Sequence, residues 1–452
     1  MRALPLLAHA LLVTALAASA HARPGNPERY PVGARQAGMG GAGIADGETP
    51  WFNPAGVGAA KQTGLSASLS AYGLTRESAR LVDGSLGDGY VVGDVATTTL
   101  DVFPASVEYV QPLGALGPLH HGIGLSVIVP DYAQFQGALE TRAEGVELDI
   151  QARQTARNQT FWLGAAWGAC AERLCLGAGP TGAVLLRDAV NNTTLFISQE
   201  GQPVLDVASS RHTELVVGSL GGQVGLQWSP LESLGFGLTV RSPMYTVGSS
   251  GSLLAINSQV IDGASFIDRV EVKNPKQEFR VPWRFGLGVT WAPSERWRVA
   301  ADVRLHLAQG EVVTIAGPNG ERTLPPEVPG RTVDDPARAI DVSEAFRLRT
   351  TVNGNLGVQY RLSDKLRVQA GVFTDLSSSP DADVLENAAD QVNRISGTLG
   401  GGWKGETVET WVSVVYAEGW GQVAGFGDEL EPVLAPLRSR SIYVMVGSWA
   451  NL

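Results

Sequence analysis

The sequence predicts an all-β protein in which about fourteen antiparallel strands close into a transmembrane β-barrel. Three observations predict this fold: apolar and polar residues alternate along long segments, short and long connections follow each other in turn, and aromatic residues gather at strand ends. Residues 297–307 and 346–360 show the alternation clearly, with arginine, asparagine or aspartate opposite an apolar face. Such segments exceed ordinary sandwich strands and suit a tilted crossing of a bilayer.

The connections between the alternating segments are of two kinds. Short ones have the composition of tight turns and lie at 229–233, 292–296, 361–365 and 404–407. Longer polar ones lie between them, at 188–210, 247–276, 309–343, 378–390 and 418–438. In bacterial barrels the short turns face the periplasm and the long loops face outside, so this order predicts an even number of strands.

Aromatic residues divide between the two ends of the predicted strands. Those beside the short turns predict a periplasmic girdle: Tyr109, Trp167, Trp228, Trp291, Trp297, Tyr360, Trp403 and Trp449. Those toward the long connections predict an outer girdle: Tyr72, Tyr245, Phe279, Phe346, Phe373, Tyr416 and Tyr443. The composition, with 11 tryptophans, 55 glycines and 17% charged residues, agrees with a membrane barrel more than with a soluble domain.

The first 22 residues predict a secretory signal peptide. Arg2 is followed by an apolar run from Ala3 to Ala18, and A-x-A cleavage sites follow at 18–20 and 20–22. This run is too short to span a membrane as a helix, and no later apolar stretch reaches about 18 residues. We therefore expect export to the bacterial outer membrane.

The segment 34–56 contains a glycine-rich stretch followed by Asn53, Pro54 and Ala55. Residues 38–43 match a dinucleotide-binding fingerprint, but no apolar strand precedes them, so we attribute the match to the abundance of glycine. The order of these motifs resembles the N-terminal segment of FadL-type outer-membrane transporters for long-chain fatty acids and other hydrophobic compounds. Segments 235–243, 360–366 and 375–381 also resemble that family, and the resemblance covers nearly the whole mature chain.

The resemblance implies a small N-terminal hatch inside the lumen of the barrel. We assign residues 1–22 to the signal peptide, 23–62 to the hatch and 63–452 to the barrel, with a hatch motif of Asn53, Pro54 and Ala55. Composition alone also fits a flexible linker. A linker has no need of large apolar side chains, and this segment carries Met39, Ile44, Trp51 and Phe52.

The function that the resemblance implies is passive uptake of long-chain fatty acids or other hydrophobic small molecules. Apolar clusters in exposed loops are costly unless they bind a ligand or pack on each other. The loop candidates for ligand binding are Leu195, Phe196, Ile197, Leu253, Leu254, Ile256 and Phe266. The lumen candidates for holding a carboxylate are Arg284, Arg304, Arg347 and Arg349, for which an ion-pair network bracing the wall is the alternative role.

The segment 122–130 contains Gly122, Gly124 and Pro130, which weaken or interrupt strand pairing. In the resembled family the third strand is kinked and forms a lateral opening, and this segment is third in the predicted order. A simpler alternative is that Pro130 ends the strand at a loop.

Other residues restrict the chemistry. Cys170 and Cys175 lie at the tips of adjoining predicted strands, where an oxidising periplasm permits a disulfide. With no nearby histidine and no assignable Ser–His pair, we expect no metal site, no cofactor and no enzymatic activity. The net charge of −11 argues against a nucleic-acid partner. We expect a monomer that contacts outer-membrane lipid and lipopolysaccharide.

Two other functions remain open at this point. PorV-like outer-membrane barrels share the glycine-rich and Asn-Pro-Ala start, and they dock secretion cargo or partners. The third possibility is an open diffusion pore.

Overall fold

The computed structural model describes residues 26, 29–79, 95–143, 147–199, 202–261, 264–316, 321–323, 344–386, 391–426 and 432–452. The predicted signal peptide, residues 1–22, lies outside these ranges. Within them, no helix is long and apolar enough to cross a membrane.

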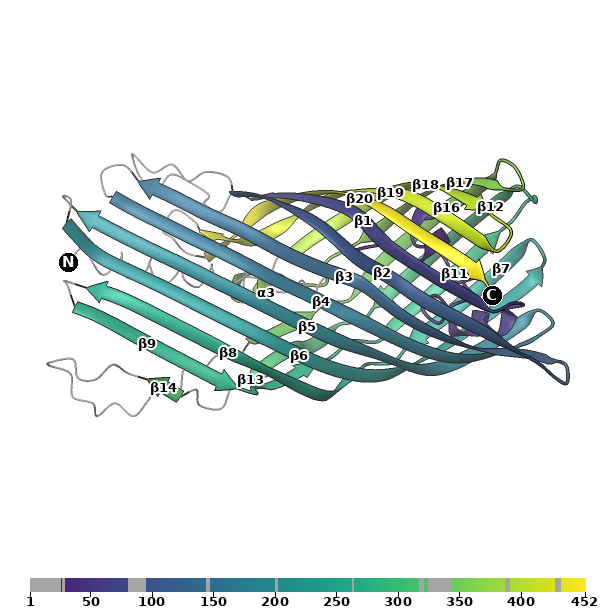
Figure 1. The fold of residues 1–452 in the computed structure, drawn as a ribbon, viewed down its shortest axis with the longest axis horizontal. Coiled ribbons are helices and arrows are strands. Elements are labelled where there is room, and N and C mark those ends of the chain that lie inside the picture. Colours follow the sequence, from purple (N-terminus) through teal and green to yellow (C-terminus); the bar gives the residue numbers. More distant parts are fainter. Residues whose placement is uncertain are drawn as a thin grey trace.

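Fourteen strands of the described chain close into an antiparallel barrel, which confirms the predicted fold (Figure 1). They are β1 (Gly64–Ala79), β2 (Val95–Leu116), β3 (Leu119–Ala143), β4 (Glu147–Ala171), β5 (Leu174–Gln199), β6 (Gln202–Leu231), β7 (Leu234–Arg241), β11 (Arg284–Trp291), β12 (Trp297–His306), β16 (Thr351–Arg361), β17 (Leu366–Asp375), β18 (Gln391–Lys404), β19 (Val408–Phe426) and β20 (Pro432–Asn451). The first and last strands pair from Gly64↔Asn451 to Ala79↔Leu437, so the ring of hydrogen bonds is complete.

The wall bears the marks of a bilayer-facing surface. Apolar side chains alternate outward along the strands, and Trp167, Trp228, Trp291, Trp297 and Trp403 are exposed beside the short turns. Tyr72, Tyr245 and Tyr416 are exposed toward the other end. A closed barrel with an apolar band between two aromatic girdles is the architecture of outer-membrane proteins. The chain is therefore an outer-membrane β-barrel.

Four aromatic residues predicted for the outer girdle lie elsewhere. Phe279, Phe346, Phe373 and Tyr443 are buried inside the barrel. Two of them leave the wall because β10 (Lys276–Phe279), β13 (Gln309–Ala316) and β15 (Glu344–Leu348) form a separate three-stranded sheet. The β10 strand lies against the inner side of the wall, where the hydroxyl of Ser219 donates to the carbonyl of Phe279 at 2.6 Å.

Several segments expected as loops are strands. Strands β3, β4, β5 and β6 contain 25, 25, 26 and 30 residues, whereas about 9–11 residues of a strand cross a bilayer. Most of 188–210 and 247–276 continues the sheet, the latter as β8 (Tyr245–Ile261) and β9 (Ala264–Lys273), to which β14 (Glu321–Thr323) adds. Backbone groups outside the membrane are satisfied equally well by water, so polar composition did not reveal this continued ladder.

The N-terminal segment 29–60 lies inside the barrel. It contains a short helix α2 (Ala34–Gly38) and a 3₁₀ helix η1 (Pro54–Ala59). The first contacts β1 and β17 to β20, while the second contacts β2 to β6 on the other side of the lumen (purple in Figure 1). Its apolar side chains are buried against the wall: Tyr30, Met39, Ile44, Phe52 and Val57.

Candidate functional site

Asn53 is the best-connected residue of the N-terminal segment and is fully buried. Its side-chain oxygen accepts from the N–H of Ala55 at 3.0 Å and caps η1, whose first residue is Pro54. Its amide nitrogen donates to the carbonyl of Ile44 at 2.9 Å and to that of Leu226 in β6 at 3.0 Å. One side chain thus starts a helix, closes the segment on itself and attaches it to the wall.

Glycine in the wall makes this close approach possible. A Cβ on Gly225 would lie 2.0 Å from the side-chain oxygen of Asn53, and one on Gly177 would lie 2.2 Å from the carbonyl oxygen of Pro54. Neither glycine tolerates a side chain while the segment is in place. Glycine at these two positions of the wall is therefore explained by the close contact with the N-terminal segment.

Strand β12 holds the other half of the segment. The Asp302 carboxylate accepts from the backbone N–H of Gly43 at 2.8 Å and of Ile44 at 3.2 Å. Arg304 donates to the carbonyl of Gly41 at 2.7 Å. Because these bonds use backbone groups of a non-helical segment, they replace the water that the segment loses inside the lumen.

An ion pair adds to this attachment. The Asp46 carboxylate lies 2.8 Å from Arg298 in β12 and 3.1 Å from Arg35 of the same segment. Burial by itself would raise the pKa of the Asp46 carboxyl, but the two guanidinium groups outweigh burial and hold that pKa below its ordinary value. The pair therefore stays charged at neutral pH.

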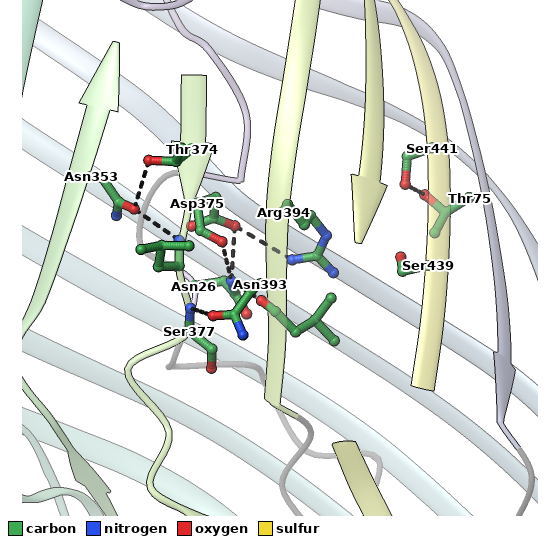
Figure 2. A network of polar contacts seen from close by, with 12 residues as sticks. Asn26, Thr75, Asn353, Thr374, Asp375, Ser377, Asn393, Arg394, Ser439 and Ser441 are labelled. Carbon is green, nitrogen blue, oxygen red and sulfur yellow. Dashed lines mark hydrogen bonds and ion pairs between the residues drawn. The ribbon is translucent and has the colours of Figure 1, made fainter. Parts of the chain in front are cut away.

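A polar network near the other end of the barrel holds residue 26 (Figure 2). The Asn26 amide donates to the Asp375 carboxylate at 2.9 Å and to the carbonyl of Val392 at 2.8 Å. Arg394 lies 3.4 Å from the same carboxylate, and both members of this ion pair are buried. The N-terminal segment is thus attached to β17 and β18 as well as to β6 and β12.

A pocket lies between the N-terminal segment and strands β7, β11 and β12. Its aromatic lining comes from both the segment and the wall: Tyr30, Trp51, Phe52, Phe285 and Phe373. Its basic lining is Arg241, Arg284, Arg304 and His306. The pocket therefore combines aromatic side chains with several cationic groups.

Two arginines and two tryptophans form a stack at this pocket. Arg241 and Arg284 are directly opposite each other on the β7–β11 ladder. Arg241 lies 4.3 Å from the ring centre of Trp51 and also donates to its carbonyl, and Arg284 lies 4.3 Å from that of Trp162. The two rings meet edge to face at 5.8 Å. Cation–π contacts thus hold two like charges close together on an apolar wall.

Behind this stack lie two neighbouring clusters of buried, packed apolar side chains, here together called the apolar chamber. Its first part contains Val32, Phe52, Ile128, Trp162, Leu185, Val217, Met244, Phe279, Val281 and Phe346. Its second part contains Tyr30, Val129, Phe373, Val415, Tyr443 and Met445. Phe279 and Phe346 come from the inner sheet, so this sheet covers the chamber.

The structure separates the four lumen arginines that the sequence grouped together. Arg284 and Arg304 line the pocket. Arg347 instead pairs with Asp383 at 2.7 Å, and Arg349 donates to the carbonyl of Ser377 at 3.2 Å. These last two therefore brace β15 against the segment that contains α3 (Asp381–Glu386). Sequence reasoning missed Arg241 and Trp162, whose roles depend on the register between strands.

The apolar residues expected in loops lie in strands. Leu253, Leu254 and Ile256 belong to β8, and Leu253 is fully buried. The backbone of Phe266 belongs to β9, and β5 contains Leu195, Phe196 and Ile197. The side chains of these last four lie outside the part of the chain that the structure describes.

Strands β2 and β3 part next to Pro130. The β2–β3 ladder begins at Leu116↔Leu119, beside the short turn, and ends at Ser106↔Ile128. Beyond Ile128, β3 pairs only with β4. A register shift lies between Ile128 and Asp131, and Ile128 and Val129 are both buried in the chamber. The strand continues past Pro130, so the proline does not end it.

The two glycines of this segment have another place. Gly122 and Gly124 are paired on both sides, with β2 and with β4. A Cβ on Gly122 would lie 2.6 Å from the carbonyl oxygen of Val57, and one on Gly124 would lie 2.9 Å from Pro50. They make room for the N-terminal segment and are not part of the parting.

Two further groups on the barrel carry reactive or ligating side chains. Cys170 and Cys175 face each other in the β4–β5 hairpin and form a disulfide. The ligand atoms of Asp188, His212 and Glu214 lie within 4.8 Å of one another on the outer face of β5 and β6. The sequence could not show this trio, because the β5–β6 register brings it together. The residues are partly or fully exposed, and we assign no metal to them.

Comparison with known proteins shows what shares this fold. No family model and no curated protein matches the chain. A FadL homologue of Pseudomonas aeruginosa superposes with a TM-score of 0.58 at 13% identity, covering 94% of this chain and 99% of the other. The Pseudomonas putida toluene transporter TodX gives 0.53 at 15%, covering 94% and 100%. The Ralstonia pickettii toluene transporter TbuX gives 0.54 at 14%, covering 94% and 99%.

Proposed function

We propose, from the fold that this chain shares with FadL-type channels, that it is a passive outer-membrane transporter of hydrophobic small molecules. The observation that carries the proposal is the pocket lined by the cross-strand pair Arg241 and Arg284, beside the apolar chamber. An apolar cavity with a few placed polar groups is the usual form of a small-molecule site. The N-terminal segment serves as a hatch in this proposal, with Asn53, Pro54 and Ala55 as its anchor.

The substrate class that fits this pocket is an apolar molecule with one anionic end, such as a long-chain fatty acid. Planar guanidinium groups bind carboxylates through two parallel hydrogen bonds. A tryptophan ring packs on each of the two arginines, and in this proposal the rest of the ligand lies against the apolar side chains of the chamber. A neutral hydrocarbon uses the chamber alone and is the weaker ligand.

The proposed exit is lateral, at the parting of β2 and β3. Ile128 and Val129 connect the two parts of the chamber at the point where the ladder ends. A hydrophobic molecule that leaves here enters the bilayer and avoids the aqueous periplasm. Pro130, which has no backbone N–H to donate, lies at this point.

Ligand binding to the purified protein tests the proposal. We expect oleate to bind in detergent and to protect Trp51, which is partly exposed in the pocket, from an aqueous quencher of tryptophan fluorescence. The variant Trp51→Phe supplies the matched background signal. If oleate, oleyl alcohol and toluene all fail to bind a barrel that migrates as folded, the lumen is not a ligand site.

One observation favours the second candidate, a barrel that docks partners. The β3–β6, β8 and β9 strands extend the wall far beyond the length needed for the bilayer, which gives a large surface outside the membrane. Deleting the gene distinguishes the two functions, because loss of a transporter impairs growth on oleate and loss of a docking protein removes surface cargo.

A further inference from the structure

Three arginines gather on the outer face of the barrel, where β1, β19 and β20 run side by side (Figure 1). Arg76 of β1 lies directly opposite Arg440 of β20, and Arg438 follows at the next outward position. All three are exposed, whereas the alternate residues Glu77, Ser439 and Ser441 are buried. The arginines therefore point away from the lumen.

Their level along the barrel corresponds to the outer edge of the apolar band. Below them on the same face, Ile442 and Tyr416 are exposed to the bilayer, and the strand runs on to its end at Asn451. From Asn451 to Arg440 is about the number of residues that crosses a bilayer. Trp420 is exposed beside Arg438, as expected for a residue at the head-group boundary.

The patch is cationic despite the overall net charge of −11. Its acidic neighbour is Glu418, which accepts from Arg440 at 3.1 Å and from the Tyr416 hydroxyl at 2.6 Å. Among the residues that the structure describes, one carboxylate faces three guanidinium groups. Like charges directly opposite each other on a ladder are destabilising, so an anion bound between Arg76 and Arg440 would stabilise this rung.

We propose that Arg76, Arg438 and Arg440 bind the phosphate groups of a phosphorylated glycolipid of the outer leaflet, the lipid A part of lipopolysaccharide. Guanidinium groups match phosphate geometry and are weakly hydrated. The apolar surface directly below, at Ile442 and Tyr416, receives the acyl chains. This continuity of cationic and apolar surface favours a lipid over free phosphate, which needs only the charges.

The test uses the purified full chain in non-ionic detergent, with bisphosphorylated lipid A, dephosphorylated lipid A and inorganic phosphate as probes. Native mass spectrometry measures the affinity of each. We expect the phosphorylated form to bind the unmodified protein at least tenfold more tightly than the dephosphorylated form. The double variant Arg76→Gln, Arg440→Gln should lose this preference, while Glu418→Gln should bind the phosphorylated form more tightly.

The matched control is Arg296→Gln, Arg361→Gln, which removes two charges from the short turns at the opposite rim. It should keep the preference. The proposal is overturned if the control loses the preference as fully as the test variant, or if the test variant keeps it. It is also overturned if inorganic phosphate binds as tightly as lipid A. Because Glu418→Gln is expected to change affinity in the opposite direction, a failure of the double variant to fold leaves the proposal testable.

Discussion

At the scale of single residues, the N-terminal segment is held by buried polar groups whose partners are mostly backbone atoms. Asn53 bonds to Ala55, Ile44 and Leu226, and Asp302 accepts two backbone N–H groups. Removing one partner leaves the others buried without hydrogen bonds, at a cost of about 1–3 kcal/mol for each group. These residues are therefore where the hatch is most sensitive to substitution.

Asn53→Ala should loosen the hatch and leave the barrel closed. The carbonyls of Ile44 and Leu226 each lose one donor, and η1 loses its cap. Limited proteolysis should then cleave within 29–60 faster than in the unmodified protein, while heat-modifiable migration on a denaturing gel is unchanged. Asn192→Ala, on the exposed part of β5, is the control. Equal protease resistance of both variants would show that Asn53 does not hold the hatch.

Arg284→Gln should weaken carboxylate ligands selectively. A charge-assisted hydrogen bond contributes about 1.5–3 kcal/mol, so oleate affinity should fall by roughly tenfold to a hundredfold. Oleyl alcohol has no charge and should bind as before. Arg347→Gln is the matched control, because Arg347 pairs with Asp383 outside the pocket. An equal loss for acid and alcohol would make the role of Arg284 structural.

Acid should weaken the attachment at Asp46. Because the folded state holds the pKa of this carboxyl below its ordinary value of 3.8, its stabilising effect is present above that value and is lost as the pH falls through the lower folded pKa. Protease cleavage within 29–60 should therefore increase below about pH 4. In Asp46→Asn the same region should be cleaved more readily at neutral pH and show less dependence on acid. A steep acid dependence that persists in this variant would assign it to another group.

At the scale of elements, the sequence predicted the strand segments inside the bilayer but not their continuation outside it. Within the membrane every backbone group must be paired inside the sheet, so alternation, turns and girdle tryptophans revealed the strands. Outside it, polar strands such as 188–199 have the composition of loops, and the extension was missed. The inner sheet was also missed, because Phe279 and Phe346 leave the wall while their sequence keeps the alternation of a wall strand. For the site, the alternation along individual strands was enough to predict that Arg284 and Arg304 face the lumen. The position of Arg241 beside Arg284 depends on the register between β7 and β11, which the sequence does not show.

The lateral exit makes a prediction about β2 and β3. Ser106→Cys with Ile128→Cys joins the last paired rung, in a background where Cys170 and Cys175 are serine. Oxidation should reduce oleate uptake several-fold, and a reductant should restore it in the same protein. The control pair Tyr109→Cys with Leu125→Cys lies lower on the ladder and should leave uptake unchanged. Full uptake through the oxidised upper rung would favour release past the hatch into the periplasm.

At the scale of the whole molecule, a closed wall and a filled lumen act together. The wall has no free edge, and the segment 29–60 occupies the interior from β6 across to β20. A water-filled pore is therefore not the architecture seen here. The pocket at Arg241 and Arg284 opens beside the buried apolar chamber, and this arrangement suits molecules that dissolve poorly in water and also cross the lipopolysaccharide layer slowly.

Uptake by intact cells tests this central claim most directly. Cells that lack their own fatty-acid channel are given the unmodified chain or Arg284→Gln, and entry of radiolabelled oleate is measured beside that of toluene. We predict faster oleate entry with the unmodified chain than with the empty vector, a reduced rate with Arg284→Gln, and toluene entry that is equal for both proteins. A correctly folded chain that speeds entry of neither compound would contradict the account.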